Sequence, residues 1–298
     1  MLQLAEVEKP APKHNEILIK VHFSTVSASA VLMRQGKHPS SKLFTFLLRL
    51  MQGITKPRNN ILGFEFSGEV EAIGNGVQQY SVGDKVYGTT TGLKQGAYAQ
   101  YLCVPEKWRY GVIAPIPKNT SFTEAAALPI STMTVLHLLK KAALKQGQKV
   151  LVYGASGSVG TYAVQLVKYF GGEVVAVCST KNIELVKSLG ADDTIDYTQT
   201  DISKYTQKFD VVFDAVGKLP SSTLKKFVKP HGKFVSVKQL TQEKAEYLAL
   251  LEKIIVEGKL KPVIDRVYNI DEIIAAHQYA DLGHKRGNVL INIANTKI

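Results

Sequence analysis

The spacing of apolar residues changes along the chain and predicts two kinds of structure. Up to about residue 118, short segments in which apolar and polar residues alternate are separated by Gly, Pro and Asn. Such alternation predicts β-strands with one buried face. We expect strands at residues 17–25, 66–73 and 96–104, with a turn and a short strand within 82–88. Many short strands of this kind are typical of a barrel-like or sandwich unit.

Beyond residue 121 the pattern becomes an alternation of helices and strands. An alanine-rich segment opens at Thr123 and Glu124, and a helix is predicted over 133–143. The later strands are predicted at residues 149–153, 173–178, 194–196, 210–214 and 232–237, and the later helices at 158–170, 182–189, 220–229 and 241–257. Repeated strand and helix units predict a doubly wound parallel sheet, so the fold class is α/β. The tail from residue 261 is predicted as strand, helix, strand.

A glycine turn follows the first strand of this second part. The apolar run 150–153 leads directly into Ala155-Ser156-Gly157-Ser158-Val159-Gly160. In a strand–turn–helix unit, Gly157 lets the backbone approach a diphosphate, and Gly160 lets the helix pack closely on the strand. A glycine turn without a nucleotide is the competing interpretation, and the complete β-α-β context favours a dinucleotide. Neither the triphosphatase loop GxxxxGK[ST] nor the hydrolase elbow GxSxG is matched.

The end of the second strand indicates which dinucleotide is bound. NAD sites usually place an Asp or Glu there to bind the ribose 2′-hydroxyl. This chain has Ser179-Thr180-Lys181 instead, so no carboxylate repels a 2′-phosphate. The two hydroxyls can donate hydrogen bonds to the phosphate, and Lys181 can neutralise it. We therefore expect NADPH rather than NADH, against the alternative that Lys181 is an ordinary surface lysine.

Composition and charge narrow the class of protein. The 298 residues are 45% hydrophobic and 21% charged, which is ordinary for one or two globular domains. The net charge is +12, with lysines spread along the chain, and no nucleic-acid module is recognisable, so no obligate nucleic-acid partner is expected. Cys103 and Cys178 are too few for a disulfide framework or a zinc cage. With no signal-peptide pattern at the start, we expect a cytoplasmic protein.

The most apolar run, residues 43–51, is too short to cross a bilayer and contains Arg49. A helix facing the core is the favoured interpretation. Two alternatives remain open, namely a helix over a substrate cleft, with Leu43 in the pocket, and a helix lying on an anionic membrane surface.

Ordered matches along nearly the whole chain resemble one family. They are residues 63–70 with Gly74, 82–86, 96–101, 124–129, 154–160 with 163–165, 214–217, 258–260 and 284–289. The chain resembles the medium-chain dehydrogenase/reductase superfamily and is most similar to its zinc-free quinone oxidoreductase branch, also called zeta-crystallin-like. The resemblance implies a GroES-like β-rich domain over residues 1–120 and 262–298, a Rossmann NADP-binding domain over 121–261, and an active site in the cleft between them.

The residues at the family's zinc positions imply that no metal is bound. Zinc-dependent relatives carry Gly-His-Glu where this chain has Gly63-Phe64-Glu65, and their first zinc cysteine has no counterpart at residues 27–30. The four-cysteine lobe would follow Tyr87, where no cysteine occurs. Because catalytic zinc needs three protein ligands, we expect none here.

The missing zinc ligands bear on the reaction. An alkoxide is hard to stabilise without a Lewis acid, whereas quinones and α,β-unsaturated carbonyls spread the developing charge by conjugation. We therefore expect NADPH-dependent reduction of a small apolar acceptor of one of these two kinds, with a tyrosine or water as proton donor. The alternative is a non-catalytic NADPH-binding protein associated with RNA or a membrane, because Ser27 and Ala30 replace the family's Asn and Asp.

The resemblance assigns roles to individual positions. The expected cofactor-binding residues are Thr134, Ser156, Gly157, Ser158, Val159, Gly160, Ser179, Lys181, Tyr197, Val216, Gly217, Ser236, Val237 and Asn288, and the expected substrate-pocket residues are Ser27, Leu43 and Phe64. The sheet is expected to be short after Val237, where many relatives have another strand and helix that are often used in dimerisation. A monomer and a homodimer therefore both remain open.

Overall fold

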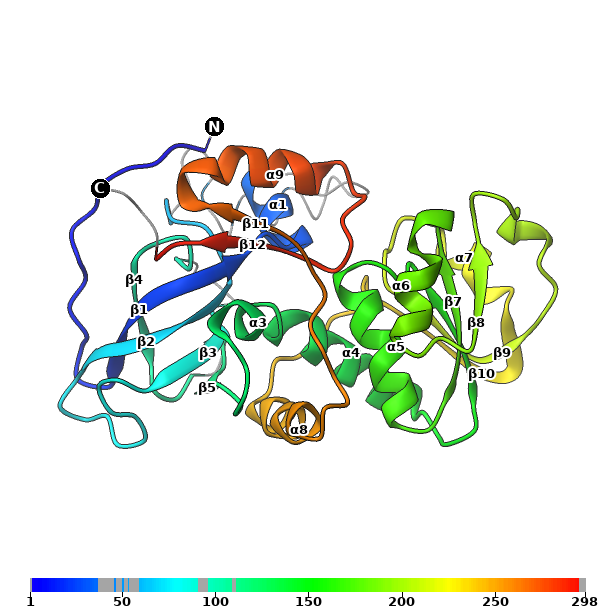
Figure 1. Ribbon diagram of the computed structural model, residues 1–298, viewed down its shortest axis with the longest axis horizontal. Coiled ribbons are helices and arrows are strands. Elements are labelled where there is room, and N and C mark those ends of the chain that lie inside the picture. The colour runs from blue at the N-terminus through cyan, green and yellow to red at the C-terminus, as the bar shows by residue number, and fades with distance from the viewer. Residues whose placement is uncertain are drawn as a thin grey trace. The chain divides into compact units, whose positions relative to one another are not determined.

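A computed structural model of the protein describes residues 2–36, 46, 50, 53, 59–90, 96–108 and 111–294 (Figure 1). The chain forms two compact units. Unit 1 comprises Met1–Pro129 and Ile264–Ile298, and unit 2 comprises Ile130–Val263. The first division falls after the expected residue 120 because helix α3 (Phe122–Ala126) packs on the strands of unit 1. The Ser67 hydroxyl, for example, donates a hydrogen bond to the carbonyl of Phe122.

Unit 1 is built around a mostly antiparallel sheet. Its strands are β1 (Glu16–Thr25), β2 (Glu65–Ile73), β3 (Lys85–Thr89), β4 (Tyr101–Pro105), β5 (Ile113–Pro115), β11 (Ile264–Asn269) and β12 (Asn288–Asn292). Its helices are α1 (Ala28–Gln35), α3 and α9 (Ile273–Asp281), with a 3-10 turn, η3, at Ile270–Glu272. The strand order is β11-β12-β1-β2-β3-β5, and β4 pairs with β1. Among the described strand pairs of unit 1, only β11 and β12 run parallel, and the other pairs are antiparallel.

Strand β1 organises unit 1 because it pairs with three other strands. Its first half pairs with β4, its last three residues pair with β12, and β2 follows it on the other edge. Two register shifts in the β1–β2 pair bend the strand between these partners. The alternating residues Ile17, Ile19 and Val21 are fully buried in the core of the unit, as the sequence pattern predicts.

The predicted strand over residues 96–104 is shorter than expected, and β4 begins only at Tyr101. The preceding amides bond elsewhere: Ala97 donates to the carbonyl of Gly63, and Tyr98 donates to that of Leu62. Gly96 has a φ of +123°, which takes the backbone out of strand geometry.

Unit 2 is a five-stranded parallel sheet with helices packed on it. Its strands are β6 (Lys149–Tyr153), β7 (Glu173–Cys178), β8 (Asp193–Asp196), β9 (Phe209–Asp214) and β10 (Val228–Ser236). Its helices are α4 (Pro129–Ala142), α5 (Ser158–Tyr169), α6 (Ile183–Ser188), α7 (Ser221–Lys225) and α8 (Ala245–Val256), with 3-10 turns η1 (Thr180–Asn182) and η2 (Ile202–Lys204). The strand order is β10-β9-β6-β7-β8, which confirms the doubly wound sheet (Figure 1).

One helix of unit 2 is shorter than predicted. The expected helix over residues 220–229 ends at Lys225, and β10 begins at Val228. Pro230 is incompatible with the predicted end of the helix at residue 229, since a proline lacks the amide that a helix needs and disfavours helical geometry in the residue before it. The β9–β10 register shifts between Val228 and Lys233, around this proline.

Leu43 lies outside the described residues, as does most of the predicted 43–51 helix. Within the part of the chain that the structure describes, no helix has both the length and the apolarity needed to cross a membrane.

A buried glutamine fastens the end of unit 2 to helix α5. The Gln165 side-chain amide donates to the carbonyls of Thr161 and Lys261, at 3.1 and 3.0 Å, and its oxygen accepts from the Lys261 amide at 2.8 Å. Gln165 is only 7% exposed, so these bonds are largely shielded from water. One side chain therefore satisfies both backbone groups of a residue 96 positions away.

We expect Gln165→Met to lower the free energy of unfolding by about 1–3 kcal/mol. The substitution keeps the length of the side chain but leaves the two backbone groups of Lys261 without their partner. Urea unfolding followed by circular dichroism measures the change, and Gln242→Met, at an exposed loop position, is the matched control. Equal stability of the two variants would show that the hydrogen bonds between Gln165 and Lys261 do not stabilise unit 2.

Candidate cofactor and acceptor site

The glycine turn lies at the carboxyl edge of the parallel sheet. The amides of Gly154 and Ala155 both donate to the carbonyl of Val177, at the end of the neighbouring strand β7. Helix α5 then begins at Ser158, with Gly157 as its N-cap and no side chain capping it. An uncapped helix start of this kind presents its first amides to an anion.

The glycines of the turn have different steric surroundings. A Cβ atom at Gly160 would lie 2.1 Å from the carbonyl oxygen of Gly154 and 2.7 Å from the Cα of Ala155. A Cβ atom at Gly157 would meet nothing closer than that same oxygen, at 3.6 Å. The protein's own packing therefore requires a glycine at position 160 but not at 157. The free space at Gly157 fits a diphosphate that approaches the backbone.

Asn182 joins the glycine turn to the end of the second strand. Its side-chain amide donates to the hydroxyls of Ser156 and Ser179, at 3.0 and 3.1 Å. Asn182 is 5% exposed, and its side-chain oxygen is buried with no hydrogen-bond partner among the described residues. A buried acceptor without a donor is costly, so this oxygen also fits a site completed by a ligand. Sequence reasoning missed Asn182, although it directly follows Lys181.

Thr180, one of the residues at the predicted 2′-phosphate site, has a partner within the protein. Its hydroxyl donates to the carboxylate of Asp196, at the end of β8. Hydrogen bonds from Thr180 and Thr198 hold the pKa of Asp196 below its usual range. Ser179, which is buried, and the exposed Lys181 are the remaining candidates.

Tyr197 follows β8, is 47% exposed, and donates its backbone amide to the carbonyl of Cys178. This hydrogen bond brings Tyr197 beside Ser179. Its ring is therefore open to a ligand at the same edge of the sheet.

The buried carboxylate of Asp214 forms hydrogen bonds with predicted residues at the ends of β9 and β10. Asp214 accepts from the amides of Val216 and Gly217, at 3.1 and 2.8 Å, and from the Ser236 hydroxyl at 2.8 Å. Its carbonyl also accepts from the amide of Val237. Asp214 is fully buried, and its hydrogen bonds fix the backbone of the residues that follow β9 and β10.

Two predicted residues of unit 2 differ in how they relate to these clusters. Val159 lies partly buried in the first turn of α5 and belongs to the glycine turn. Thr134 is partly buried on α4, and no hydrogen bond among the described residues joins it to the turn, to Asn182 or to Asp214.

Two predicted residues of unit 1, Ser27 and Asn288, lie close to each other. Val26 donates its amide to the carbonyl of Val289, so Ser27 follows directly where β12 passes β1. The Ser27 hydroxyl caps helix α1 by accepting from the Ala30 amide at 3.2 Å. Asn288 is buried at the start of β12.

Phe64, which replaces the zinc-binding histidine of relatives, is 3% exposed and directly precedes β2. Among the described residues, no group of three or more His, Cys, Asp or Glu side chains is arranged to hold a metal ion.

A buried polar cluster that sequence reasoning missed surrounds Glu65. The Thr25 hydroxyl donates to the Glu65 carboxylate, and the Tyr98 hydroxyl donates to the Thr25 carbonyl at 2.9 Å. The Lys285 ammonium lies 3.4 Å from the carbonyl oxygen of Val26. Burial lowers the pKa of Lys285 to about 8, although the negative charges of Glu65 and Asp265 act in the opposite direction. Glu65, Tyr98 and Lys285 all belong to the segments that carry the family resemblance.

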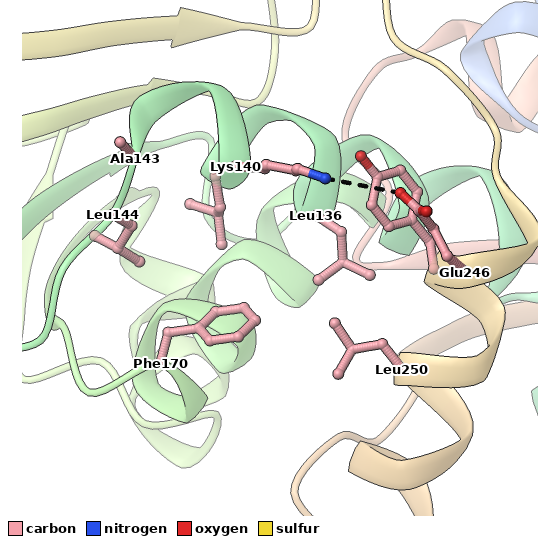
Figure 2. Close-up of a pocket in the computed structure, with 9 residues that line it drawn as sticks. Leu136, Lys140, Ala143, Leu144, Phe170, Glu246 and Leu250 are labelled. Carbon is pink, nitrogen blue, oxygen red and sulfur yellow. Dashed lines mark ion pairs between the residues drawn. The ribbon is translucent and has the colours of Figure 1, made fainter.

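An apolar groove of about 470 Å³ lies elsewhere in unit 2. Figure 2 shows its walls, which are formed by Leu136, Leu139, Lys140, Ala143, Leu144, Phe170, Glu246, Tyr247 and Leu250. At its rim, Lys140 and Glu246 form an exposed ion pair of 3.7 Å. None of these residues belongs to the predicted cofactor set, so the groove is separate from the carboxyl edge of the sheet.

Comparisons with known proteins agree with this fold. The GroES-like domain of alcohol dehydrogenases matches residues 13–118, and the family described as zinc-binding dehydrogenase matches residues 158–260. A 2-methylene-furan-3-one reductase of Solanum lycopersicum is 33% identical, with 97% of this chain and 74% of that protein covered. An NADPH-dependent alkenal/one oxidoreductase of Arabidopsis thaliana, chloroplastic by name, is 31% identical, with coverages of 95% and 73%.

Among solved structures, the quinone oxidoreductase from Coxiella burnetii superimposes with a TM-score of 0.81 at 28% identity, covering 98% of this chain and 94% of its own. The chain therefore belongs to the medium-chain dehydrogenase/reductase superfamily. Its relatives include quinone oxidoreductases and alkenal/one reductases, as the sequence motifs indicate.

The two glycines make a paired test of the turn. Gly157→Ala should cost no more than about 1 kcal/mol of stability, as expected at an N-cap, and should weaken NADPH binding by about tenfold or more because the added methyl group fills the space for the diphosphate. Gly160→Ala should destabilise the protein by about 3 kcal/mol, because its methyl group meets fixed backbone. Thermal unfolding and fluorescence titration with NADPH measure both effects. Normal NADPH affinity in a folded Gly157→Ala protein would remove the diphosphate from this turn.

Proposed function

We propose that this protein is an NADPH-dependent oxidoreductase that reduces quinones or α,β-unsaturated carbonyl compounds. The observation that carries the proposal is the glycine turn of unit 2, tied by Asn182 to a strand end that carries Lys181 and no carboxylate. The relatives at 31–33% identity, which are named as reductases of such compounds, support the acceptor class.

Unit 2 is the proposed cofactor-binding domain. Ser156, Gly157, Ser158, Val159 and Gly160 would hold the diphosphate, and Ser179, Lys181 and Tyr197 would hold the adenosine end. Val216, Gly217, Ser236 and Val237, set in place by Asp214, would line the ribose and nicotinamide, with Thr134 facing the cofactor from α4. When bound, reduced NADPH supplies a hydride, which is two electrons and a proton delivered as one unit.

Unit 1 is the proposed acceptor-binding domain. Phe64 and Ser27 supply the apolar and polar parts of the pocket, and Asn288 faces the nicotinamide end. The residues at the family's zinc positions cannot provide a metal to stabilise an alkoxide, which favours acceptors whose own conjugation spreads the charge. The protein's contribution is then to position the acceptor and to exclude water.

Assembly and compartment are separate proposals. A homodimer and a monomer both remain open, and sedimentation velocity decides between them. The two thiols support a reducing compartment, and we propose the cytoplasm. A fluorescent fusion in the native host tests this proposal. The chloroplast is the alternative location, because one relative is chloroplastic by name.

Absorbance of the reduced nicotinamide tests the function directly. We expect steady loss of the NADPH signal with members of a panel of quinones and enones, slower loss with NADH, and none without an acceptor. Saturable NADPH binding without turnover across the panel would instead favour a non-catalytic NADPH-binding protein. Salt-sensitive RNA binding in the same preparation would point in that direction too.

Lys181→Ala tests the choice of cofactor. Loss of a charged partner for the 2′-phosphate should weaken NADPH binding about 10–100-fold and leave NADH binding nearly unchanged. Lys187→Ala, at another exposed lysine on α6, is the matched control. Equal losses for both nucleotides would show that Lys181 does not contact the 2′-phosphate.

A further inference from the structure

We infer that Lys285 binds the carbonyl oxygen of the acceptor and donates the proton that completes its reduction. The inference rests on the proposed function and assigns the proton donor to a lysine, in place of the tyrosine or water expected from the sequence.

The position of Lys285 points to this role. Its ammonium lies 3.4 Å from the carbonyl oxygen of Val26, the residue just before Ser27. Val26 is bonded through its amide to Val289, the residue just after Asn288. The ammonium therefore stands at the place in unit 1 where two proposed site segments meet, and it projects there from the loop between α9 and β12.

Carboxylates on two different strands help to keep this partly buried cation charged. Glu65 lies on β2 and Asp265 on β11, and both attract the Lys285 ammonium. Each carboxylate also has other donors: Glu65 accepts from the Thr25 hydroxyl, and Asp265 accepts from the Tyr279 hydroxyl and the Arg286 amide. Burial opposes them and is the larger effect, so the pKa falls to about 8. The group is therefore protonated at neutral pH and releases its proton readily.

The other titratable groups of the cluster are poorer donors. Burial raises the pKa of Tyr98, whose hydroxyl already donates to the Thr25 carbonyl. His277 is fully buried against the edge of the Tyr98 ring, and burial lowers its pKa to about 4, so it carries no extra proton at neutral pH. Of these three groups, Lys285 is the one that is protonated at neutral pH and has a pKa close to that range.

The step balances for both acceptor classes. The C–H bond of the dihydronicotinamide breaks with its electron pair, and a new C–H bond forms on the acceptor. The conjugated π electrons then move to the carbonyl oxygen. An N–H bond of Lys285 breaks as an O–H bond forms on that oxygen. NADPH is oxidised to NADP⁺, and the acceptor is reduced by two electrons to an enol, which becomes the saturated ketone. For a quinone, the hydride adds to a ring carbon and the proton to one oxygen; that ring carbon then loses a proton to water and the second oxygen gains one, which gives the aromatic hydroquinone. Neutral Lys285 regains a proton from water.

Three variants and a pH profile test the inference. Lys285→Met should lower kcat about 100-fold, as expected for the loss of a general acid. Lys285→Arg should keep the KM for the acceptor close to that of the wild type but leave kcat low, since a guanidinium binds the oxygen and does not release a proton. Lys118→Met, at an exposed turn of unit 1, should behave as the wild type.

The wild-type kcat should fall as pH rises through about 8, because the active form of Lys285 is the protonated one. The Lys285→Met variant should lose this fall. Thermal unfolding and NADPH titration of each variant show whether a lost rate reflects a lost fold or a lost cofactor.

The outcomes separate this inference from the proposed function. No turnover by the wild type with any quinone or enone defeats the proposed function. Wild-type turnover combined with an unchanged kcat in a folded Lys285→Met protein overturns the role of Lys285 alone. If that variant does not fold, the wild-type profile decides, and a kcat that stays flat from about pH 7 to 9 rejects Lys285 as the proton donor.

Discussion

The close approach of helix α5 to strand β6 is the contact on which unit 2 depends. At Gly160 the helix backbone comes so near to the carbonyl of Gly154 that no side chain fits between them. This contact brings the start of α5 to the carboxyl edge of the sheet. The strand ends that carry Ser179 and Asp214 meet at the same edge, so the cofactor residues gather there without any long loop.

In unit 1, the pairing of strand β1 brings the polar residues around Glu65 together. Strand β1 is shared among three partners, and its bends bring Thr25 and Val26 to the Glu65 carboxylate and the Lys285 ammonium. Burying charged groups is unfavourable unless they are compensated, and here a hydroxyl, a carbonyl and two carboxylates share that role. The polar cluster is thus a product of the strand pairing itself.

Structure formed by consecutive residues could be predicted from the sequence, whereas contacts between distant segments could not. The glycine turn is readable because strand, turn and helix are consecutive, and most strands of unit 2 were predicted to within a residue or two. The roles of Asn182 and Lys285 depend on partners 26 and 259 positions away, which no local pattern reveals. The hydrogen bond from Thr180 to Asp196 escapes sequence reasoning for the same reason, since Asp196 comes from the next strand of the sheet.

The interruption of β10 has a consequence for how copies of this chain can associate. This strand stands last in the sheet order of the described residues, and a free sheet edge normally accepts another strand by hydrogen bonding. Pro230 has no amide to donate, and the register shift around it bends the strand. A second molecule therefore cannot extend the sheet across β10 with a full ladder of hydrogen bonds, which protects this edge from unwanted strand pairing.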